Sequence, residues 1–266
     1  MLGAIIGDVC GSLYEFKSDK TKSFPFFQMG CRATDDSMMT IAVGCALVNS
    51  SYHDKEDFQN RLCKMMREIG RAHPDAGYGK KFYYWLMGEI KGPYNSYGNG
   101  SAMRVSPTAW IAKTLEEAET LAKWSAEVTH NHEEGIKGAQ AISACIFLAR
   151  QGKSKEEIKS YVEENYYDLS FTLDQIRPSY KFDVTCQGSV PQGIMCFLES
   201  TDFEDAVRNA ISLGGDGDTI GAMAGAIAEA YYGIPEHLAE EVFDYIDEDI
   251  VDYYNEYAEE IYKGEY

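Results

Sequence analysis

Basic residues are scarce in this 266-residue sequence. Lysine and arginine together number 24, against 43 aspartates and glutamates, and the formal net charge is −19. Proteins that bind nucleic acid need clusters of lysine and arginine to neutralise the phosphates. The composition therefore argues against nucleic acid as a partner.

Signals for secretion or membrane insertion are missing as well. The seven cysteines are scattered and include no Cys-x-x-Cys pair, which is typical of a reduced, intracellular protein. No run approaches 18 apolar residues, the length that crosses a membrane. The opening MLGAIIGDVCGS is apolar but short, lacks a basic start and contains Asp8, unlike a signal peptide. We expect a cytoplasmic protein that has no membrane contact.

Alternating strand patterns and Gly/Ser-rich or Pro-rich linkers are also absent, and apolar residues recur at the i, i+3, i+4 spacing of helices. The sequence predicts an all-α fold, a single-domain orthogonal bundle of about a dozen helices over residues 1–266. Thr114, Ser154 and Thr201 are expected N-caps. The predicted helices are 2–14, 35–50, 55–71, 79–90, 101–113, 115–128, 134–151, 155–165, 190–199, 203–212, 219–232, 236–245 and 247–262.

The acidic excess is concentrated at the C-terminal end. From Glu236 to Tyr266 there are 12 acids and one lysine. Aromatic residues alternate with these acids, which favours the solvated face of a helix over a docking site for a basic partner. We expect a core of about residues 2–238, followed by a peripheral, acidic and Tyr-rich helix at 243–266.

The segment 219–232 carries very little side-chain bulk. Glycine inside a helix costs about 1 kcal/mol relative to alanine, and close approach of another helix is the simplest compensation. The segment is therefore expected to be central, with Asp216 and Asp218 at the N-terminal end of a buried helix. Its small residues include Gly221, Ala222, Ala224, Gly225, Ala226 and Ala228.

Two acidic clusters stand before predicted helices. In the first, helix capping by Thr34 with Asp35 and Asp36 in the first turn is a sufficient explanation on its own. In the second, GGDGDT, two acids lie two residues apart in a glycine-rich turn, and no lysine or arginine occurs from residue 209 to 232. Buried carboxylates need cations, so a metal is the natural partner.

The donor set consists mainly of carboxylate and hydroxyl oxygens. Such hard ligands select Mg²⁺, Mn²⁺ or Ca²⁺ over Zn²⁺, and five or six of them suit two ions better than one. Spacing alone does not show that the two clusters meet, because about 180 positions separate them.

Five motifs carry a resemblance to a known family. GAIIGDVCGSLYEF, TDDSMMT, SYGNGSAMR, THNHEEGIKGAQAI and GGDGDTIGAMAGAIAEAYYG occur in the order seen in the ADP-ribosylglycohydrolase family. The resemblance covers about residues 2–238 and implies an all-α fold with a binuclear Mg²⁺ (or Mn²⁺) centre. The family turn is usually GGDTDT, and Gly217 departs from it. The missing side chain is not an implied ligand, so we expect metal binding to survive, although a more flexible turn could weaken it. By position, the implied metal ligands are Thr34, Asp35, Asp36, Asp216, Asp218 and Thr219.

The resemblance also implies substrate contacts. Glu15 corresponds to a glutamate on a mobile flap in the serine-specific branch, and His130 to a histidine beside the bound diphosphate. A loop with Gly188 and Val190, placed before a helix with Pro191 in its first turn, is similar to one near the adenine. A purely structural role for that loop is an equal alternative. The expected diphosphate turn consists of Ser96, Tyr97, Gly98, Asn99 and Gly100, whose backbone N–H groups can bind an anion or simply start a helix.

The neighbouring residues His132, Glu133 and Glu134 are expected to cap the helix that follows His130. No cysteine or third histidine stands nearby to make a metal site of the two histidines.

The function implied is a Mg²⁺-dependent hydrolase that cleaves the bond between ADP-ribose and a modified arginine or serine side chain of a protein. Its partner would be an ADP-ribosylated protein or ADP-ribose conjugate, and we expect a monomer. One alternative is hydrolysis of O-acetyl-ADP-ribose or another small conjugate; the other is a non-catalytic immunity protein that binds ADP-ribosylated targets or a transferase. Candidates for the catalytic carboxylate are Glu15, Asp35, Asp36 and Asp218.

Overall fold

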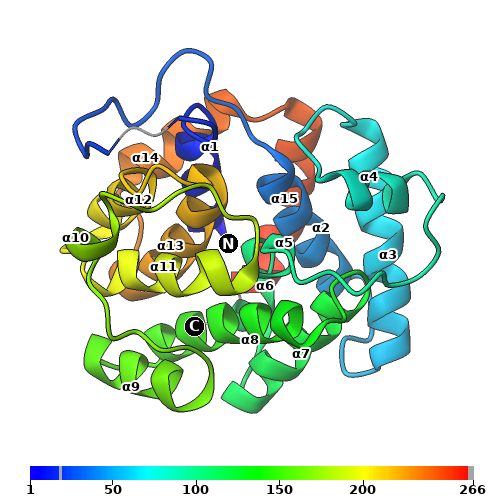
Figure 1. The fold of residues 1–266 in the computed structure, drawn as a ribbon. Helices are drawn as coiled ribbons and strands as arrows, with labels where there is room; N and C mark the ends of the chain where they lie inside the picture. Colours follow the sequence, from blue (N-terminus) through cyan, green and yellow to red (C-terminus); the bar gives the residue numbers. More distant parts are fainter. Residues whose placement is uncertain (18–19, 263–266) are drawn as a thin grey trace.

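The structure, a computed structural model, describes residues 1–17 and 20–262. The regular secondary structure of these residues is helical (Figure 1). These ranges contain no β-strand and one isolated bridge, between Gly98 and Thr185. The predicted all-α, single-domain fold is confirmed. The elements are α1 (Leu2–Gly11), α2 (Asp35–Val48), α3 (Lys55–Ala72), α4 (Lys80–Leu86), α5 (Gly100–Met103), α6 (Ser106–Ile111), α7 (Leu115–Glu127), α8 (Glu133–Arg150), α9 (Lys155–Asn165), α10 (Leu173–Ile176), α11 (Cys186–Leu198), α12 (Phe203–Ile211), α13 (Gly217–Tyr232), α14 (Glu236–Glu241), the 3₁₀ helix η1 (Val242–Tyr245) and α15 (Glu248–Tyr262).

Several predicted helices have different boundaries in the structure. The helix predicted at 2–14 ends at Gly11, the one at 79–90 covers Lys80–Leu86, and 236–245 is divided into α14 and η1. The segment 101–113 forms two short helices, α5 and α6, and Pro107 lies at the start of the second, where a missing N–H costs nothing. The segment 190–199 belongs to a helix that already begins at Cys186, because the Thr185 hydroxyl accepts the N–H of Gly188. The expectation that Pro191 occupies a first turn is therefore wrong, and Pro191 lies inside α11.

Side-chain caps define most helix starts. Thr114 caps α7, and Ser154 forms a complete capping box with Glu157 at α9, as predicted. Thr201 is not the cap of α12. The carboxylate of Asp202 takes that role and accepts the N–H of Asp205.

The contact between α1 and α13 is the centre of the fold. Figure 1 shows the two helices near the middle of the molecule. Helices α8, α11 and α12 pack on α13, α2 packs on α1, and α3 and α15 pack on α2. Every residue of α1 is buried, and so is α13 from Gly217 to Glu229. The prediction that 219–232 forms a central helix is confirmed.

Glycines on both helices allow their backbones to touch. A Cβ atom on Gly7 would lie 2.0 Å from the carbonyl oxygen of Gly221, and one on Gly3 would lie 2.4 Å from that of Gly225. A Cβ on Gly11 would lie 2.5 Å from the Cα of Asp218. Any side chain at these positions would push the helices apart.

The C-terminal helix α15 is not peripheral. Ile250 and Ile261 are fully buried, and α15 packs against α2 and α6. The hydroxyl of Tyr262 donates to Glu229 of α13 at 2.6 Å and accepts the backbone N–H of Leu2 at 3.0 Å. The acidic, aromatic pattern therefore describes a helix with one solvated face and one core face. The last part of the predicted helix, 263–266, lies outside the described residues.

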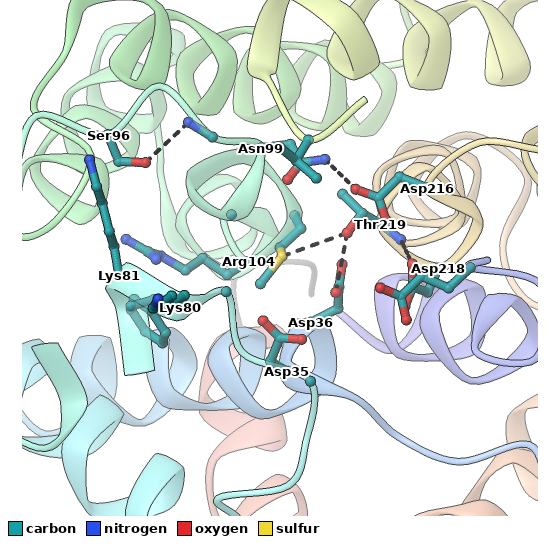
Figure 2. A pocket seen from close by; sticks show the side chains of 18 of the residues that line it. Asp35, Asp36, Lys80, Lys81, Ser96, Asn99, Arg104, Asp216, Asp218 and Thr219 are labelled. Carbon is teal, nitrogen blue, oxygen red and sulfur yellow. Dashed lines mark hydrogen bonds between the residues drawn. The ribbon is translucent and has the colours of Figure 1, made fainter. Parts of the chain in front are cut away.

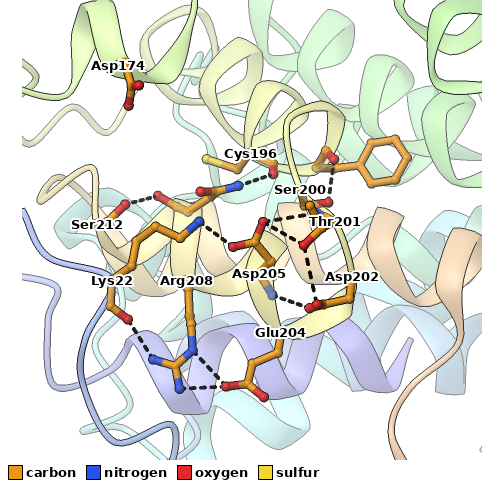
Figure 3. Close-up of polar contacts among 12 residues, drawn as sticks. Lys22, Asp174, Cys196, Ser200, Thr201, Asp202, Glu204, Asp205, Arg208 and Ser212 are labelled. Carbon is orange, nitrogen blue, oxygen red and sulfur yellow. Dashed lines mark hydrogen bonds and ion pairs between the residues drawn. The ribbon is translucent and has the colours of Figure 1, made fainter.

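The segment between α1 and α2 is tied to α12. Arg208 donates to the carbonyl oxygens of Lys22 and Phe24 at 2.8 and 2.7 Å, and Lys22 pairs with Asp205 (Figure 3). These bonds hold residues 22–24 against α12. None of the described helices combines the length and apolar character needed to cross a membrane.

The backbone contact predicts a large effect of one methyl group. Replacement of Gly7 by alanine should lower the free energy of unfolding by about 3 kcal/mol, since the added Cβ meets backbone that cannot rotate away. Gly79→Ala is the matched control, because a Cβ added to Gly79 would have no heavy atom within 4 Å and its φ is −57°. Urea unfolding of both variants measures the difference. Equal stabilities would contradict the close contact between α1 and α13.

Candidate metal centre and adjoining pocket

A pocket of about 400 Å³ opens beside the N-terminal end of α13 (Figure 2). One half is acidic and contains Glu15, Asp35, Asp36, Asp216 and Asp218. The other half is formed by the turn before α5 and by cationic or imidazole side chains. Its lining residues include Ser96, Gly98, Asn99, Gly100, Arg104 and His130, with Lys80 and Lys81 at the same side. The pocket therefore joins two regions of opposite character.

The two acidic clusters of the sequence meet here, about 180 positions apart in the chain. The Thr34 hydroxyl caps α2 by accepting the N–H of Asp36. Thr219, in the first turn of α13, donates its hydroxyl to Asp36 at 3.3 Å. The N-terminal ends of α2 and α13 thus face each other across the acidic half (Figure 2).

Asp8 of α1 connects these ends, and sequence reasoning missed it. Its carboxylate accepts the backbone N–H of Thr34 at 2.8 Å and of Ser37 at 3.0 Å, as well as both hydroxyls of these residues. The signal was present, because Asp8 is the one acid in an apolar helix whose glycines recur every four residues. An acid at such a position needs a buried polar partner.

Two groups of three carboxylates share one member. The potential ligand oxygens of Asp8, Asp36 and Asp218 lie within 4.8 Å of one another, and so do those of Glu15, Asp216 and Asp218. All of these residues except Glu15 are buried. Asp35 lines the same half of the pocket but belongs to neither group.

The acidic half lacks a protein cation. Among the described residues, no lysine or arginine forms an ion pair with these carboxylates. One oxygen of Asp36, Oδ1, is buried and has no hydrogen-bond partner. Buried, unpaired charge of this kind is costly, and oxygen donors of this kind suit a hard divalent cation. The residues present therefore fit a metal site.

Burial and mutual repulsion raise the pKa values of the cluster. Desolvation is the main cause at Asp36 and Asp218, whose pKa values lie well above the ordinary range, and neighbouring aspartates add to it. The pKa of Asp35 is also raised well above the usual range, first by burial and then by Asp218. Desolvation raises the pKa of Asp216 to about 6. The cluster thus binds protons in the absence of a metal.

Glu15 stands at the rim of the acidic half, in the segment after α1. It is partly exposed, and its pKa is raised to about 7, first by desolvation and then by the charges of Asp218 and Asp8. A carboxyl group with such a pKa is able both to give and to take a proton near neutral pH. Phe16 follows it and contacts Phe182 across the pocket mouth, with ring centroids 5.6 Å apart.

The turn before α5 connects the two halves. The side-chain amide of Asn99 donates to Asp216 at 2.7 Å. Two backbone amides of the turn are already paired inside the protein, because Gly98 N–H donates to Ser96 Oγ and Asn99 N–H to the carbonyl of Val184. Ser96, Gly98, Asn99 and Gly100 all line the pocket.

His130 lies behind this turn, buried and next to Arg104. Burial lowers the pKa of the imidazole well below its ordinary value, and the charge of Arg104 lowers it further. The ring is therefore neutral near pH 7. His132, as predicted, caps α8, and its Nδ1 accepts the N–H of Glu134.

Four of the residues expected in the site do not line the pocket. Thr34 is buried behind Asp36, where it contacts Asp8. Tyr97 is 47% exposed and packs its ring against His132. Gly188 and Val190 lie within α11, and Val190 is fully buried. Their suggested roles stay predictions.

Lining residues that the sequence did not single out include Arg104, Lys80, Lys81 and Phe182. Arg104 is the last residue of the motif SYGNGSAMR, and its position in that motif indicates that it lies close to the turn. Nothing in the periodicity of residues 79–90 or 180–185 indicates that these segments reach the site.

Comparisons with known proteins show which proteins this chain resembles. The model of a family described as ADP-ribosylglycohydrolase matches residues 1–266. The chain is 27% identical to ADP-ribosylhydrolase ARH3 of Homo sapiens, over 94% of this chain and 90% of that protein. It is 28% identical to ADP-ribosylarginine hydrolase Tri1 of Pseudomonas putida (strain GB-1), over 88% of this chain and 70% of that protein. A solved structure titled ADP-ribosylglycohydrolase-related protein complex has the same fold, with a TM-score of 0.66, 21% identity and coverage of 100% and 96% of the two chains.

The raised pKa values predict how pH affects the metal-free protein. A carboxyl group with a higher pKa in the folded state binds more protons when folded, so the free energy of unfolding falls as pH rises. The fall should start near the ordinary pKa of about 4 and continue at least to the values of about 6 for Asp216 and about 7 for Glu15. Denaturant unfolding in EDTA should show a loss of at least about 1 kcal/mol between these limits, and Mg²⁺ should restore stability at neutral pH.

Asp218→Asn tests the origin of this effect, because Asp218 belongs to both carboxylate groups. In EDTA at pH 7.5 the variant should be at least as stable as the wild type, since one repelling charge is gone. It should gain little from Mg²⁺. Asp252→Asn, on the exposed face of α15, should behave like the wild type. A wild-type stability that neither Mg²⁺ nor Mn²⁺ changes would rule out the metal centre.

Proposed function

The chain belongs to the ADP-ribosylglycohydrolase family, and from this premise we propose that it is a Mg²⁺-dependent hydrolase that removes ADP-ribose from modified protein side chains. The observation that carries the proposal is the pair of carboxylate groups that share Asp218 at the wall of a pocket. A binding module would not need so many buried acids, because their repulsion lowers stability unless a cation is bound.

The relatives support the substrate class. Both are named as hydrolases of ADP-ribosylated substrates, and one name specifies arginine. We propose a modified arginine or serine as the leaving side chain, and the assay below distinguishes the two. The seven cysteines are all free thiols, which agrees with the reducing, cytoplasmic setting that we propose.

The metal site would use the buried acids. Asp36, Asp216 and Asp218 line the pocket and belong to the two carboxylate groups, and hard oxygen donors favour Mg²⁺, with Mn²⁺ as the alternative. The sharing of Asp218 suits two ions, and Thr34, Asp35 and Thr219 complete the proposed ligand set. When bound, such ions supply a polarised water and an anchor for sugar hydroxyls.

The protein residues would handle orientation and protons. The acidic half of the pocket stabilises positive charge on the ribose ring, as cleavage through an oxocarbenium-like transition state requires. Glu15 is the proposed proton carrier, because it is partly exposed and lines the pocket, and because desolvation first and then the charges of Asp218 and Asp8 raise its pKa to about 7 in the metal-free protein. It would protonate the departing nitrogen or oxygen as the glycosidic bond breaks.

The opposite half would hold the rest of ADP-ribose. Ser96, Gly98 and Gly100 present small groups and backbone to the pocket beside His130. We propose that the diphosphate lies against this turn. Asn99 binds Asp216, so it would keep the diphosphate site at a fixed distance from the carboxylates.

Release of free ADP-ribose tests the function. Arginine-modified and serine-modified proteins are incubated with the enzyme in parallel, in Mg²⁺ and in EDTA. We expect Mg²⁺-dependent release from one of them, and a loss of at least about 100-fold in Asp218→Asn because a carboxylate shared by both groups is removed. Asp252→Asn is the control and should retain wild-type activity.

The same assay includes O-acetyl-ADP-ribose. Release from this ester alone would assign the enzyme to small ADP-ribose conjugates. Binding of ADP-ribose without release from any of the three substrates would instead support the non-catalytic alternative, and full activity in EDTA would exclude a metal-dependent reaction.

Glu15→Gln tests the proton carrier. We expect kcat to fall by about 10²- to 10⁴-fold, the usual contribution of general acid–base catalysis, while the Kd for ADP-ribose stays nearly constant. The wild-type rate should decline as pH rises and Glu15 loses its proton, and this limb should be missing in the variant. Lys17→Gln, an exposed change on the same segment, is the control. An unchanged kcat in Glu15→Gln would move the role to Asp35, Asp36 or Asp218.

A further inference from the structure

We propose that Arg104 and Thr129 are positioning residues that keep the proton of His130 on Nε2, so that the imidazole donates a hydrogen bond to the diphosphate of the substrate. The inference rests on the proposed function for the identity of the ligand. The arrangement of the three side chains is independent of it.

The chain of hydrogen bonds has a defined direction. Nη2 of Arg104 donates to Oγ1 of Thr129 at 2.9 Å, and Oγ1 lies 2.7 Å from Nδ1 of His130. A guanidinium has no acceptor atom, so Thr129 accepts the first bond. The threonine hydroxyl keeps one hydrogen of its own, which must find an acceptor because Thr129 is fully buried.

Nδ1 of His130 is that acceptor. In the part of the chain that the structure describes, the Thr129 hydroxyl has no other partner than Arg104 and His130. If Nδ1 carried a proton, it would point at the hydroxyl, whose own hydrogen would then be buried without an acceptor. In the tautomer with the proton on Nε2, the threonine hydroxyl donates to Nδ1, and no buried hydrogen lacks an acceptor. In the neutral ring, therefore, the proton is on Nε2.

Nε2 faces the turn before α5. A Cβ atom on Gly100 would lie 3.3 Å from Nε2, and one on Gly98 would lie 3.6 Å from it. The two glycines thus leave the donor accessible from the pocket, which all three residues line. A neutral donor at this place suits an anionic group, since it can bind phosphate oxygen without itself requiring a counter-ion.

Arg104 adds a buried positive charge to the same half. Its side chain is fully buried, its Nη2 also donates to the carbonyl of Ser125 at 3.1 Å, and its Nε has no partner. Among the described residues no carboxylate forms an ion pair with it. A buried charge without a counter-ion is costly, and an anionic ligand in the pocket that Arg104 lines would compensate it.

The first measurement determines the tautomer of His130 in the wild-type protein. Long-range ¹H–¹⁵N NMR spectra of the full-length protein distinguish the two histidine tautomers, and His130→Gln identifies the signal among the five histidines. We expect the Nε2–H form. A predominant Nδ1–H form would overturn the inference, whether or not the threonine variants below fold.

The second measurement compares three threonine variants by calorimetric titration with ADP-ribose. Thr129→Val keeps the shape but loses the hydroxyl, so His130 should populate both tautomers and the Kd should rise about tenfold, the loss expected for one outer-shell partner. Thr129→Ser keeps the hydroxyl and should restore both the tautomer and the Kd. Thr108→Val removes another fully buried hydroxyl, away from the pocket lining, and should leave the Kd unchanged.

The outcomes separate the two claims. A wild-type protein that neither binds nor releases ADP-ribose contradicts the proposed function. If the wild type and Thr129→Val bind ADP-ribose with the same Kd, and the wild type cleaves ADP-ribose from modified protein normally, the inference alone is contradicted. Melting temperatures of all variants show whether a change in Kd reflects partial unfolding.

Discussion

The direct backbone contact between α1 and α13 is the constraint on which the candidate site depends. Gly3 and Gly7 face Gly225 and Gly221 so closely that neither helix could carry a side chain there. Helix α1 supplies Asp8 and leads into Glu15, whereas α13 begins at the turn that carries Asp216 and Asp218. The separation of the acids is thus set by the closest approach that two helices permit. A wider spacing would draw the shared carboxylate, Asp218, away from one of its two groups.

This construction links stability to the ligand. Folding brings buried carboxylates together, and among the described residues no lysine or arginine pairs with them; burial first, and then repulsion from neighbouring acids, raises the pKa values of Asp35, Asp36 and Asp218. The carboxylate of Asp8 accepts four hydrogen bonds from the N–H and hydroxyl groups of Thr34 and Ser37, whereas Oδ1 of Asp36 has no partner among the described residues. The negative charge of the other carboxylates needs a bound cation to neutralise it. Binding of the proposed metal would therefore also stabilise the contact between α1 and α13.

Local features of the fold followed from the sequence, and long-range ones did not. The caps Thr114 and Ser154 and the crowded helix 219–232 were predictable, because each depends on residues a few positions apart. The partner of that helix was not identified, although the glycines at 3, 7 and 11 have the matching four-residue spacing. For α15, the tyrosines between the acids predict a solvated, peripheral helix, whereas the hydroxyl of Tyr262 donates to Glu229 in the interior. A single charged residue has no periodic signal, so Asp8 and Arg104 are recognisable only from the motifs around them.

The overall charge of −19 repels an anionic substrate such as the proposed ADP-ribose conjugate. The pocket resolves this difficulty by separating charge over a short distance. Its acidic half attracts cations, and its other half brings Arg104, Lys80 and Lys81 to a turn made of small residues. Asn99 joins the two by donating to Asp216 from that turn. Since Coulomb interactions between exposed charges are screened within about 8 Å at physiological ionic strength, these local groups outweigh the distant acidic surface. A ligand that carries both a diphosphate and sugar hydroxyls matches such a divided site better than a ligand with either group alone.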